Sequence, residues 1–294
     1  MSNWVMKKGG KIREVWENTN GRVLLVASDR VAGFNDVLPN IEVPDKGKLL
    51  TQISAFWFKH TEGVAPNAFI TCDNNEMEGL VAEEPQNQGR CMLMKKLSML
   101  PIEAIVRGNI CGTLWEAYES GKREFSGLPI PEGIRRSESL PKPMFTPSTK
   151  EPAGVIDRNL SFEEMIEHIR RAGFEDAEFI AERVREYSLA LYNFGREYAI
   201  TRGLIVAQVK FEFGIDENGV VVLGDELFTP DSTRFWLKSD FKIGEQQEEL
   251  DKIIIQHWLD KNPGEKEIPS KTIELARSRY VECYERIVGG RFCP

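Results

Sequence analysis

Three charged side chains in one short stretch could together bind a nucleotide through a metal ion. Polar and apolar residues alternate over residues 208–214, so Lys210 and Glu212 share one face of a predicted strand. Asn218-Gly219 is a strong hairpin signal, after which the chain returns to Asp225. A two-residue loop puts Glu212 opposite Asp225, and a four-residue loop puts Lys210 there. Two carboxylates beside an ammonium suit magnesium with nucleotide phosphates, and a solvated polar face is the alternative interpretation.

Two other segments combine arginine with hydroxyl groups and flexible backbone, which is typical of monophosphate binding. They are Arg107-Gly108-Asn109-Ile110-Cys111-Gly112-Thr113 and Asp231-Ser232-Thr233-Arg234, and surface arginines in loops are the alternative. Gly9-Gly10-Lys11 is a candidate glycine turn over phosphates, with Lys11 as the point charge. The sequence contains neither the P-loop pattern nor the Gly-x-Gly-x-x-Gly fingerprint. Any nucleotide must therefore be held in another way.

Composition excludes several classes of protein. The 294 residues predict about two domains, and 41% hydrophobic with 29% charged residues is typical of a globular chain. The net charge of −8, with no basic run longer than a pair, argues against a nucleic-acid partner. No stretch approaches the ~20 apolar residues of a membrane span, and the first residues lack a secretory signal pattern. We expect a cytoplasmic protein with small-molecule partners.

Hydrophobic periodicity predicts the elements that position these residues. Strands are expected over residues 22–28, 90–94 and 102–107, and a helix over 49–60. Residues 126–152 are rich in Pro, Gly, Ser and Lys and predict a long loop. Ser161 and Glu164 form a predicted capping box for a helix that ends at Gly173, and a longer helix is expected over 176–201. A helical region over 245–288 is broken at Asn262-Pro263-Gly264.

These segments closely resemble the SAICAR synthetase family, in the family's order and spacing. The resemblance runs from about Gly10 to Trp258. The segments that carry it are Ser28-Asp29-Arg30, Asp45-Lys46-Gly47, residues 101–107, Phe145-Thr146-Pro147-Ser148-Thr149-Lys150, Lys210-Phe211-Glu212-Phe213-Gly214 and residues 224–234.

The resemblance implies an α+β fold of two domains, ATP-grasp-like, with antiparallel sheets and flanking helices. The expected domains are a β-rich nucleotide-covering one over residues 1–100 and a catalytic one over 101–294. It also implies an ATP-dependent ligase of purine biosynthesis, acting with magnesium as a monomer or small homo-oligomer. ATP phosphorylates the carboxylate of carboxyaminoimidazole ribonucleotide, and the amine of L-aspartate then displaces phosphate to form an amide.

The resemblance further implies roles for individual residues. Lys210, Glu212 and Asp225 are the expected catalytic residues, and Glu212 and Asp225 are the expected magnesium ligands. The expected ATP-binding residues are Lys11, Arg13, Met94, Lys96, Met99, Glu103, Lys150, Glu212 and Asp225. The expected substrate-binding residues are Arg107, Gly112, Thr113, Gln208, Lys210, Ser232, Arg234 and Lys46.

The chain departs from the family pattern at three positions. Gln208 replaces the usual Asp, Thr113 replaces Ser, and Asn35 stands where Asp is usual, with Asp36 one place late. Gln208 can still accept a hydrogen bond through its carbonyl, whereas an uncompensated loss costs ~1.5–3 kcal/mol. Changes on the substrate side leave open a related ATP-dependent amide ligase for another heterocyclic carboxylate or amine. A non-catalytic nucleotide-binding protein is a third interpretation, which the predicted metal ligands disfavour.

Overall fold

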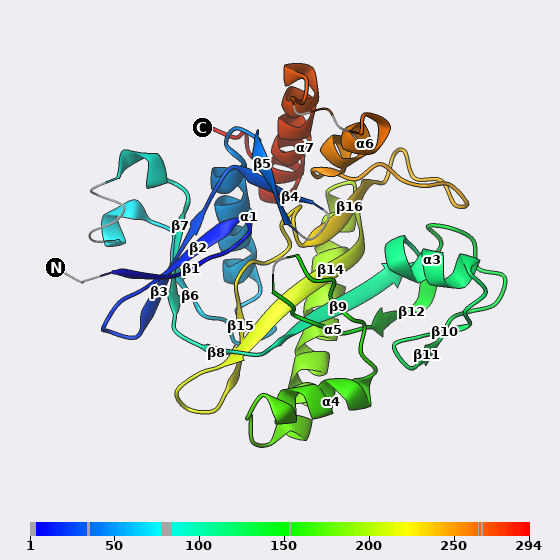
Figure 1. Ribbon diagram of the computed structural model, residues 1–294, viewed down its shortest axis with the longest axis horizontal. Coiled ribbons are helices and arrows are strands. Elements are labelled where there is room, and N and C mark those ends of the chain that lie inside the picture. Colours follow the sequence, from blue (N-terminus) through cyan, green and yellow to red (C-terminus); the bar gives the residue numbers. More distant parts are fainter. Residues whose placement is uncertain (1–3, 34–35, 78–83, 153, 264, 266) are drawn as a thin grey trace.

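Two antiparallel sheets lie side by side in the molecule, with helices against them (Figure 1). The computed structural model describes residues 4–33, 36–77, 84–152, 154–263, 265 and 267–294. Asn35 and Gly264 lie outside these residues, so the predictions that involve them are not addressed by the structure. In the described part of the chain, no helix is long and apolar enough to cross a membrane.

The first sheet has five strands in the order β1-β2-β3-β7-β6. Their bounds are β1 Val5–Gly9, β2 Arg13–Glu17, β3 Arg22–Ala27, β6 Phe69–Thr71 and β7 Cys91–Lys95. The apolar run of β3 is buried at its last four residues, as expected for the predicted strand over 22–28. Beside this sheet lie a hairpin of β4 (Arg30–Gly33) and β5 (Asp36–Glu42), the helix α1 (Lys46–His60), and two single 3-10 turns (Asn74–Glu76 and Pro85–Asn87). The helix predicted over 49–60 is confirmed.

The second, central sheet has seven strands around the long strand β14. Its path is β12-β9-β14-β15, with β13 paired to β9 and both β8 and β16 paired to β14. The bounds are β8 Ser98–Met99, β9 Ile102–Asn109, β12 Ser139–Phe145, β13 Ser148–Thr149, β14 Leu204–Ile215, β15 Val221–Gly224 and β16 Thr233–Leu237. All eight residues of β9 are buried; the strand is paired on both edges, and α5 packs against it.

The long loop predicted over 126–152 is wrong in part. It contains β12 and β13, which pair with β9, and β11 (Leu128–Pro129), which forms a small hairpin with β10 (Glu124–Phe125). Pro141 and Pro143 lie in β12 between its paired ends, where the register with β9 is irregular. Proline is tolerated at such irregular edge positions, so composition alone did not distinguish this strand from a loop.

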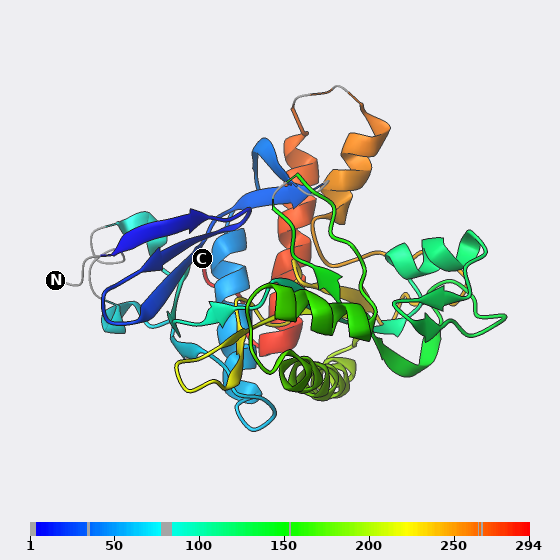
Figure 2. The same ribbon diagram turned by 60° about the horizontal axis from the view of Figure 1, so that its bottom comes forward.

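Five further helices complete the described fold. They are α3 (Gly112–Glu119), α4 (Phe162–Arg171), α5 (Ala177–Thr201), α6 (Ile253–Lys261) and α7 (Ser270–Val288). The predicted capping box is confirmed: the Glu164 N–H donates to Ser161 Oγ at 3.1 Å, and the Ser161 N–H donates to Glu164 Oε2 at 2.7 Å. Figure 2 shows the N-terminal sheet and the segment around α3 at opposite ends of the molecule.

One apolar cluster joins the two sheets, and smaller clusters hold the periphery. Trp57 of α1 packs on Phe228 with 4.8 Å between ring centroids, and Phe228 packs edge-on against Phe211 of β14. Burying each such side chain contributes roughly 1.5–3 kcal/mol. A separate cluster lies inside residues 110–144, and a third joins α1 to α6 and α7. The predicted domain boundary near residue 100 stays a prediction. The C-terminal helix α7 packs against α1, which lies before that boundary in the sequence.

The hairpin between β14 and β15 has a different register from both predicted ones. Its loop has three residues, because the Asp216 N–H donates to the Val220 carbonyl and the Gly219 N–H donates back to the Asp216 carbonyl. Gly219 has φ of +80°, the left-handed conformation that three-residue hairpin loops place on glycine. Glu212 therefore lies opposite Gly224, and both expected registers are wrong by one residue. Asp225 follows the strand in a left-handed conformation, with φ of +54°.

Candidate active site

Two lysines and two glutamates form what we call the carboxylate–lysine centre: Glu103, Lys150, Lys210 and Glu212. Lys210 Nζ lies 2.6 Å from Glu103 Oε1, and Lys150 Nζ pairs with Glu212 Oε2. Glu103 lies on β9, Lys210 and Glu212 lie on one face of β14, and Lys150 directly follows β13. Pairing of these strands therefore brings together residues from three separate parts of the sequence. Four predicted site residues meet here.

Mutual attraction favours the charged forms of Lys150, Lys210 and Glu212 despite their burial, whereas burial outweighs the attraction of Lys210 at Glu103 and raises the pKa of that carboxyl. Burial opposes the charge of Lys210, but the Glu103 and Glu212 carboxylates outweigh burial and raise the pKa of Lys210. Burial likewise opposes ionisation of Glu212, but Lys150 and Lys210 hold the pKa of Glu212 below its usual value. Glu212 and Asp225 raise the pKa of Lys150 against its own burial. Both lysines thus stay protonated at neutral pH and act as cations rather than bases.

Asp225 lies close to this centre and has oxygens available for a ligand. Its charge is felt by Lys150 and by Arg13, yet it forms no hydrogen bond or ion pair with the described residues. The neighbouring Glu226 instead forms an ion pair with Arg13, whose Nη2 lies 2.8 Å from Glu226 Oε2. No group of three or more described His, Cys, Asp or Glu side chains could hold a metal alone. Two carboxylates completed by phosphate oxygens are nevertheless a usual magnesium environment, so Glu212 and Asp225 fit this ion.

Arg107 lies at the centre of a second group, which we call the arginine pocket: Arg107, Thr113, Thr146, Gln208 and Arg234. The Arg107 guanidinium donates to Gln208 Oε1 at 2.6 Å, to Thr146 Oγ1 at 2.9 Å and to Thr113 Oγ1 at 3.2 Å. Its face lies over the Phe125 ring, 5.1 Å from the centroid. Burial above all, together with the charge of Arg234, lowers the pKa of Arg107 to about 10 against the attraction of Glu116, so Arg107 remains a cation at neutral pH.

Two glycines are required by this pocket for different reasons. A side chain on Gly108 would overlap the Tyr192 hydroxyl, which donates to the Val206 carbonyl at 2.9 Å. Gly112 starts α3 with φ of +52°, and a Cβ there would lie 3.2 Å from Arg234 Nη2. The predicted Gly112 thus allows the Arg234 guanidinium to approach the first turn of a helix. Arg234 itself pairs with Glu249.

Lys46 is placed differently from the other predicted substrate-binding residues. Its side chain is fully buried, with Nζ 2.6 Å from Asp231 Oδ2 and 2.9 Å from the Arg30 carbonyl. Asp231 also accepts from the Tyr280 hydroxyl of α7 at 2.6 Å. Ser232 is buried beside this network, and its carbonyl accepts from the Lys210 N–H at 2.8 Å. Lys46 and Ser232 therefore contact residues that support the site, such as Asp231 and the backbone of Lys210.

The remaining predicted ATP-binding residues are spread over the first sheet and its connection to the second. Lys11 lies in the turn between β1 and β2 and makes no hydrogen bond or ion pair with the described residues. Met94 is buried in β7, and Lys96 pairs with Glu17 on β2 at 2.8 Å. Met99 is 40% exposed on β8, opposite Gly214. The structure thus brings Met99 close to the carboxylate–lysine centre and leaves the Lys96 ammonium on the first sheet.

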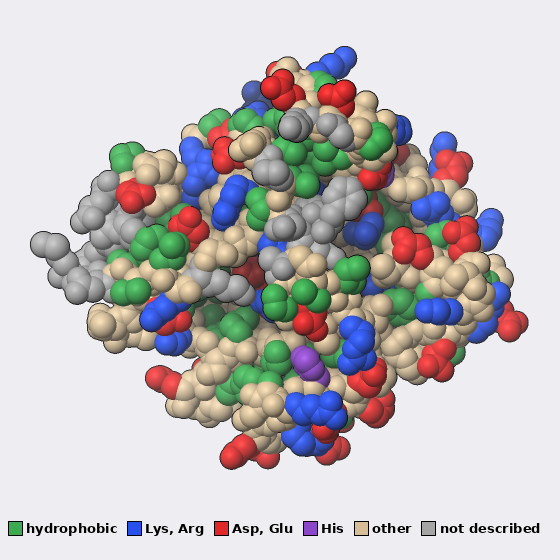
Figure 3. Space-filling view, viewed as in Figure 1, with side chains coloured by type: hydrophobic (Ala, Val, Ile, Leu, Met, Phe, Trp, Pro, Cys, Tyr) green, Lys and Arg blue, Asp and Glu red, His purple; other side chains and the backbone are tan. Residues whose placement is uncertain are grey.

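Sequence reasoning missed several residues of the site. Thr146, Glu226 and Asp231 lie inside the segments that carry the family resemblance, so their position offered a signal. Glu249 and Tyr280 offered none, because each lies outside the segments that carry the resemblance, 15 and 49 residues along the chain from its partner. Figure 3 shows a hollow near the centre of one face, with acidic and basic side chains meeting inside it.

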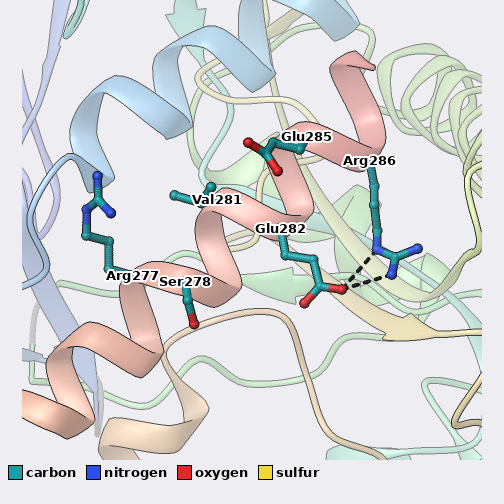
Figure 4. A pocket seen from close by; sticks show the side chains of 6 residues that line it. All are labelled: Arg277, Ser278, Val281, Glu282, Glu285 and Arg286. Atoms are coloured by element: carbon teal, nitrogen blue, oxygen red, sulfur yellow. Dashed lines mark hydrogen bonds and ion pairs between the residues drawn. The ribbon is translucent and has the colours of Figure 1, made fainter. Parts of the chain in front are cut away.

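A surface cavity of ≈ 470 Å³ elsewhere has a different character. It lies along α7 and is lined by Arg277, Ser278, Val281, Glu282, Glu285 and Arg286 (Figure 4). Glu282 and Arg286 pair with each other there, and Arg277 turns away to pair with Asp45. None of the predicted site residues lines this cavity, so we place the candidate site at the two groups on β9 and β14.

Comparison with known proteins identifies the family. The family model of SAICAR synthetase matches residues 6–271. The chain belongs to the SAICAR synthetase family. It is 40% identical to the phosphoribosylaminoimidazole-succinocarboxamide synthase of Lachnospira eligens, over 96% of this chain and 95% of the relative. It is 38% identical to the enzyme of that name from Methylobacillus flagellatus, over 96% and 94% of the two chains.

The fold agrees with this family as well. A solved SAICAR synthase from Saccharomyces cerevisiae, complexed with SAICAR, matches with a TM-score of 0.87 and 32% identity, covering 99% of this chain and 97% of that one. The predicted family and α+β fold are confirmed. As a SAICAR synthetase, the chain is an ATP-dependent ligase of purine biosynthesis that joins carboxyaminoimidazole ribonucleotide to aspartate.

Proposed function

We propose that the two groups on β14 divide the SAICAR synthetase reaction between them. The arginine pocket holds the 5′-phosphate of the ribonucleotide, and the carboxylate–lysine centre holds the reacting carboxylate against ATP. The observation that carries the proposal is their placement on one strand face. Gln208 and Glu212 are four residues apart on β14, roughly 13 Å at the usual strand rise. That separation is comparable with the length of a nucleoside monophosphate, so one substrate can reach both groups.

The chemistry fits the charges of the centre. A carboxylate oxygen of the ribonucleotide attacks the γ-phosphorus of ATP, and the bond to ADP breaks. The aspartate amine then attacks the acyl carbon, loses a proton, and phosphate leaves with the bonding electrons. Lys150 and Lys210 are protonated cations, so they stabilise the negative charge on the transferred phosphoryl group. Neither step needs a histidine, so the small number of histidines in the chain, three, does not conflict with this chemistry.

Magnesium is part of the same proposal. Glu212 and Asp225 would hold the ion, and it would neutralise charge on the phosphates of ATP. We assign the remaining nucleotide contacts to Lys11, Arg13 and the connection between β7 and β8. The Leu97 N–H in that connection takes part in none of the backbone hydrogen bonds of the described residues, so it can donate to a ligand. Residues 1–100 would then cover the nucleotide as a domain.

Location and assembly complete the proposal. We assign the enzyme to the cytoplasm, where ATP and sugar phosphates are made, with no nucleic-acid or membrane partner. We further propose a monomer or small homo-oligomer, which light scattering coupled to size-exclusion chromatography measures directly.

The experiment that tests the function is phosphate release by the purified protein. It receives magnesium-ATP, carboxyaminoimidazole ribonucleotide and L-aspartate, with each omitted in turn. We expect release that requires all three, together with the succinocarboxamide product. Release that ignores aspartate or the ribonucleotide would contradict the proposal and favour a ligase for another carboxylate or amine.

A further inference from the structure

A buried tyrosine far along the chain contacts the segment that carries two predicted site residues. Residues 225–232 connect β15 to β16 and include Asp225 and Ser232. Tyr280 of α7 is fully buried, and its hydroxyl donates to Asp231 Oδ1 at 2.6 Å. Burial, followed by the charge of Asp231, raises the pKa of Tyr280 well above its usual value, so the hydroxyl keeps its proton and donates. None of the reaction steps uses this hydroxyl directly.

The 225–232 segment is strained at two residues and depends on contacts with other elements. Asp225 and Phe228 both have a left-handed backbone, with φ of +54° and +47°, which residues other than glycine rarely adopt. Such strain persists only where surrounding contacts fix the chain. One of these contacts is the ion pair of Glu226 with Arg13 of β2, at 2.8 Å. The conformation of the segment is therefore set by its side-chain anchors.

Asp231 is the second anchor, and different elements hold its two carboxylate oxygens. Lys46 Nζ of α1 lies 2.6 Å from Oδ2, and the Tyr280 hydroxyl reaches Oδ1. A bond at one oxygen alone lets the carboxylate turn about it, whereas a bond at each oxygen fixes its plane. One turn earlier on α7, Arg277 Nη2 pairs with Asp45 at 2.6 Å. The same helix thus holds both Asp231 and the residue that precedes Lys46.

We propose that Tyr280 is a positioning residue for the ligase reaction, because its hydroxyl fixes Asp231 and, through it, the backbone that presents Asp225. The carbonyl of the next residue, Ser232, accepts from the Lys210 N–H at 2.8 Å, which ties this anchor to the carboxylate–lysine centre. A small shift of Asp225 misplaces a charge that must be preorganised for phosphoryl transfer. The inference rests on the proposed function for the role of Asp225, whereas the anchoring itself concerns Tyr280 and Asp231.

The direct test is Tyr280→Phe, which removes the hydroxyl and keeps the ring, whose centroid lies 5.8 Å from Lys46 Nζ. We expect the variant to fold, with a melting temperature lower by a few degrees. We expect kcat to fall about tenfold and the magnesium concentration for half-maximal rate to rise about threefold or more. The KM for the ribonucleotide should change less than about twofold, because the side-chain bonds of Arg107 and Arg234 do not involve Asp231. A merely structural role would lower the melting temperature and leave kcat of the folded enzyme unchanged.

Hydrogen–deuterium exchange of the free protein gives a readout that needs neither substrate nor metal. We expect the backbone amides of residues 225–232 to exchange about tenfold faster in Tyr280→Phe than in the wild type, and those of α4 to be unchanged. Faster exchange with unchanged kcat would overturn the inference, because the position of the segment would then not matter to the reaction. A fall in kcat without faster exchange would overturn it as well, because the hydroxyl would then act in another way.

Tyr198→Phe is the matched control, because the Tyr198 hydroxyl of α5 also donates to α7, at the Ile287 carbonyl over 2.8 Å, two turns beyond Tyr280. It should lower the melting temperature by a similar amount and leave kcat and the magnesium requirement unchanged. Equal losses of kcat in the two variants would overturn the inference, because the Tyr280 hydroxyl would then act only by securing α7.

Lys252→Met keeps the inference testable if Tyr280→Phe does not fold. Lys252 Nζ lies 3.8 Å from Asp231 Oδ1, the oxygen to which Tyr280 donates. Its removal should change kcat and the exchange of residues 225–232 in the same direction, by about threefold, because Asp231 loses a second contact at this oxygen. Unchanged kcat and unchanged exchange in this variant would contradict the inference.

Failure of this inference can be told apart from failure of the proposed function. If the wild type does not release phosphate with the three substrates, the proposed function is wrong, and hydrogen exchange of Tyr280→Phe still tests the anchoring of the segment. If the wild type is active and Tyr280→Phe keeps both its kcat and its exchange rates, the inference is wrong and the function stands.

Discussion

The two halves of the active site solve the problem of buried charge in opposite ways. Around the carboxylate–lysine centre, three cations (Arg13, Lys150 and Lys210) face four carboxylates (Glu103, Glu212, Asp225 and Glu226), so positive and negative charges nearly cancel. In the arginine pocket, the only ion pair of the two arginines with the described residues is that of Arg234 with Glu249, and Glu116 and Asp251 act on the arginines only from a distance. The same strand, β14, contributes to both halves.

The difference indicates what each half is adapted to bind. A nearly balanced centre holds its own geometry without ligand, and it can receive a metal–nucleotide complex whose charges are themselves largely paired. A pocket with excess positive charge is complete only when a dianion enters. Removing a charge should therefore be harmful in the first half and tolerated, for stability, in the second.

The largest expected effect comes from breaking the balanced half at Glu212. Glu212→Gln removes a predicted magnesium ligand and the partner of Lys150. We expect kcat/KM to fall about a thousandfold, because phosphoryl transfer depends on preorganised charge. Steady-state phosphate release at several magnesium concentrations measures this. Glu217→Gln, in the exposed loop of the same hairpin, is the control, and activity of Glu212→Gln within tenfold of that control would refute the role of Glu212.

The second prediction compares stability across the two halves. Lys150→Met leaves the buried Glu212 carboxylate without its partner, so we expect the free energy of unfolding to fall by about 2 kcal/mol. Arg107→Met removes a charge that has no ionic partner, and we expect a change within about 1 kcal/mol, or a gain. Urea denaturation of both variants measures the contrast. Equal losses would mean that the two halves do not differ in the way their charges are compensated.

The third prediction sharpens the comparison inside the arginine pocket. Lysine keeps the charge but loses the planar, multiple hydrogen-bond donors of arginine. Arg107→Lys should raise the KM for the ribonucleotide about a hundredfold, and Arg234→Lys about tenfold, because Glu249 already takes part of the Arg234 charge. Arg136→Lys is the control for these two variants, because Arg136 also donates to a glutamine, Gln246, but on the exposed surface, so the KM of this variant should be unchanged. A larger effect at Arg234 than at Arg107 would reverse our assignment of the main phosphate contact.

Sequence reasoning predicted the parts of this site that depend on neighbouring residues. The alternation of β14 places Gln208, Lys210 and Glu212 on one face, and the capping box at Ser161 begins α4 as expected. These features follow from a strand period of two and from short-range capping bonds, both of which are readable locally. The family resemblance then supplied the roles, which remain predictions at the level of single residues.

Partners across long sequence separations could not be predicted in this way. Gln208 and Arg107 are 101 residues apart, and Tyr280 and Asp231 are 49 apart, so only the packed fold decides that they meet. The hairpin register failed for a smaller reason: a three-residue loop, set by the left-handed Gly219, shifts the pairing by one residue. Burial of Lys46 was also hidden, because it depends on how α7 packs against α1.

The smallest expected effect concerns the edge of the arginine pocket, where Asp251 lies beside Arg234. Burial and the neighbouring Glu249 raise the pKa of Asp251 to about 7, against the attraction of Lys252 and the hydrogen bond from the Ile253 N–H. Tyr280 and Cys283 of α7 also lie near Asp251, and both are uncharged because burial raises their pKa values. In the unfolded chain its pKa is about 3.9, so the folded state binds the extra proton between these values. Stability from this group is thus fully present below about pH 4 and is lost as the pH rises towards 7.

Asp251→Asn should remove this loss. We expect the variant to match the wild type near pH 4 and to exceed its free energy of unfolding by roughly 1 to 2 kcal/mol at pH 8, since partial exposure screens the charge. Urea denaturation from pH 4 to pH 8 measures the slope, with the exposed Asp240→Asn as the control. A parallel pH dependence in wild type and Asp251→Asn would show that Asp251 ionises normally. The pocket would then carry one more negative charge than we assign to it, and the contrast with the carboxylate–lysine centre would be correspondingly smaller.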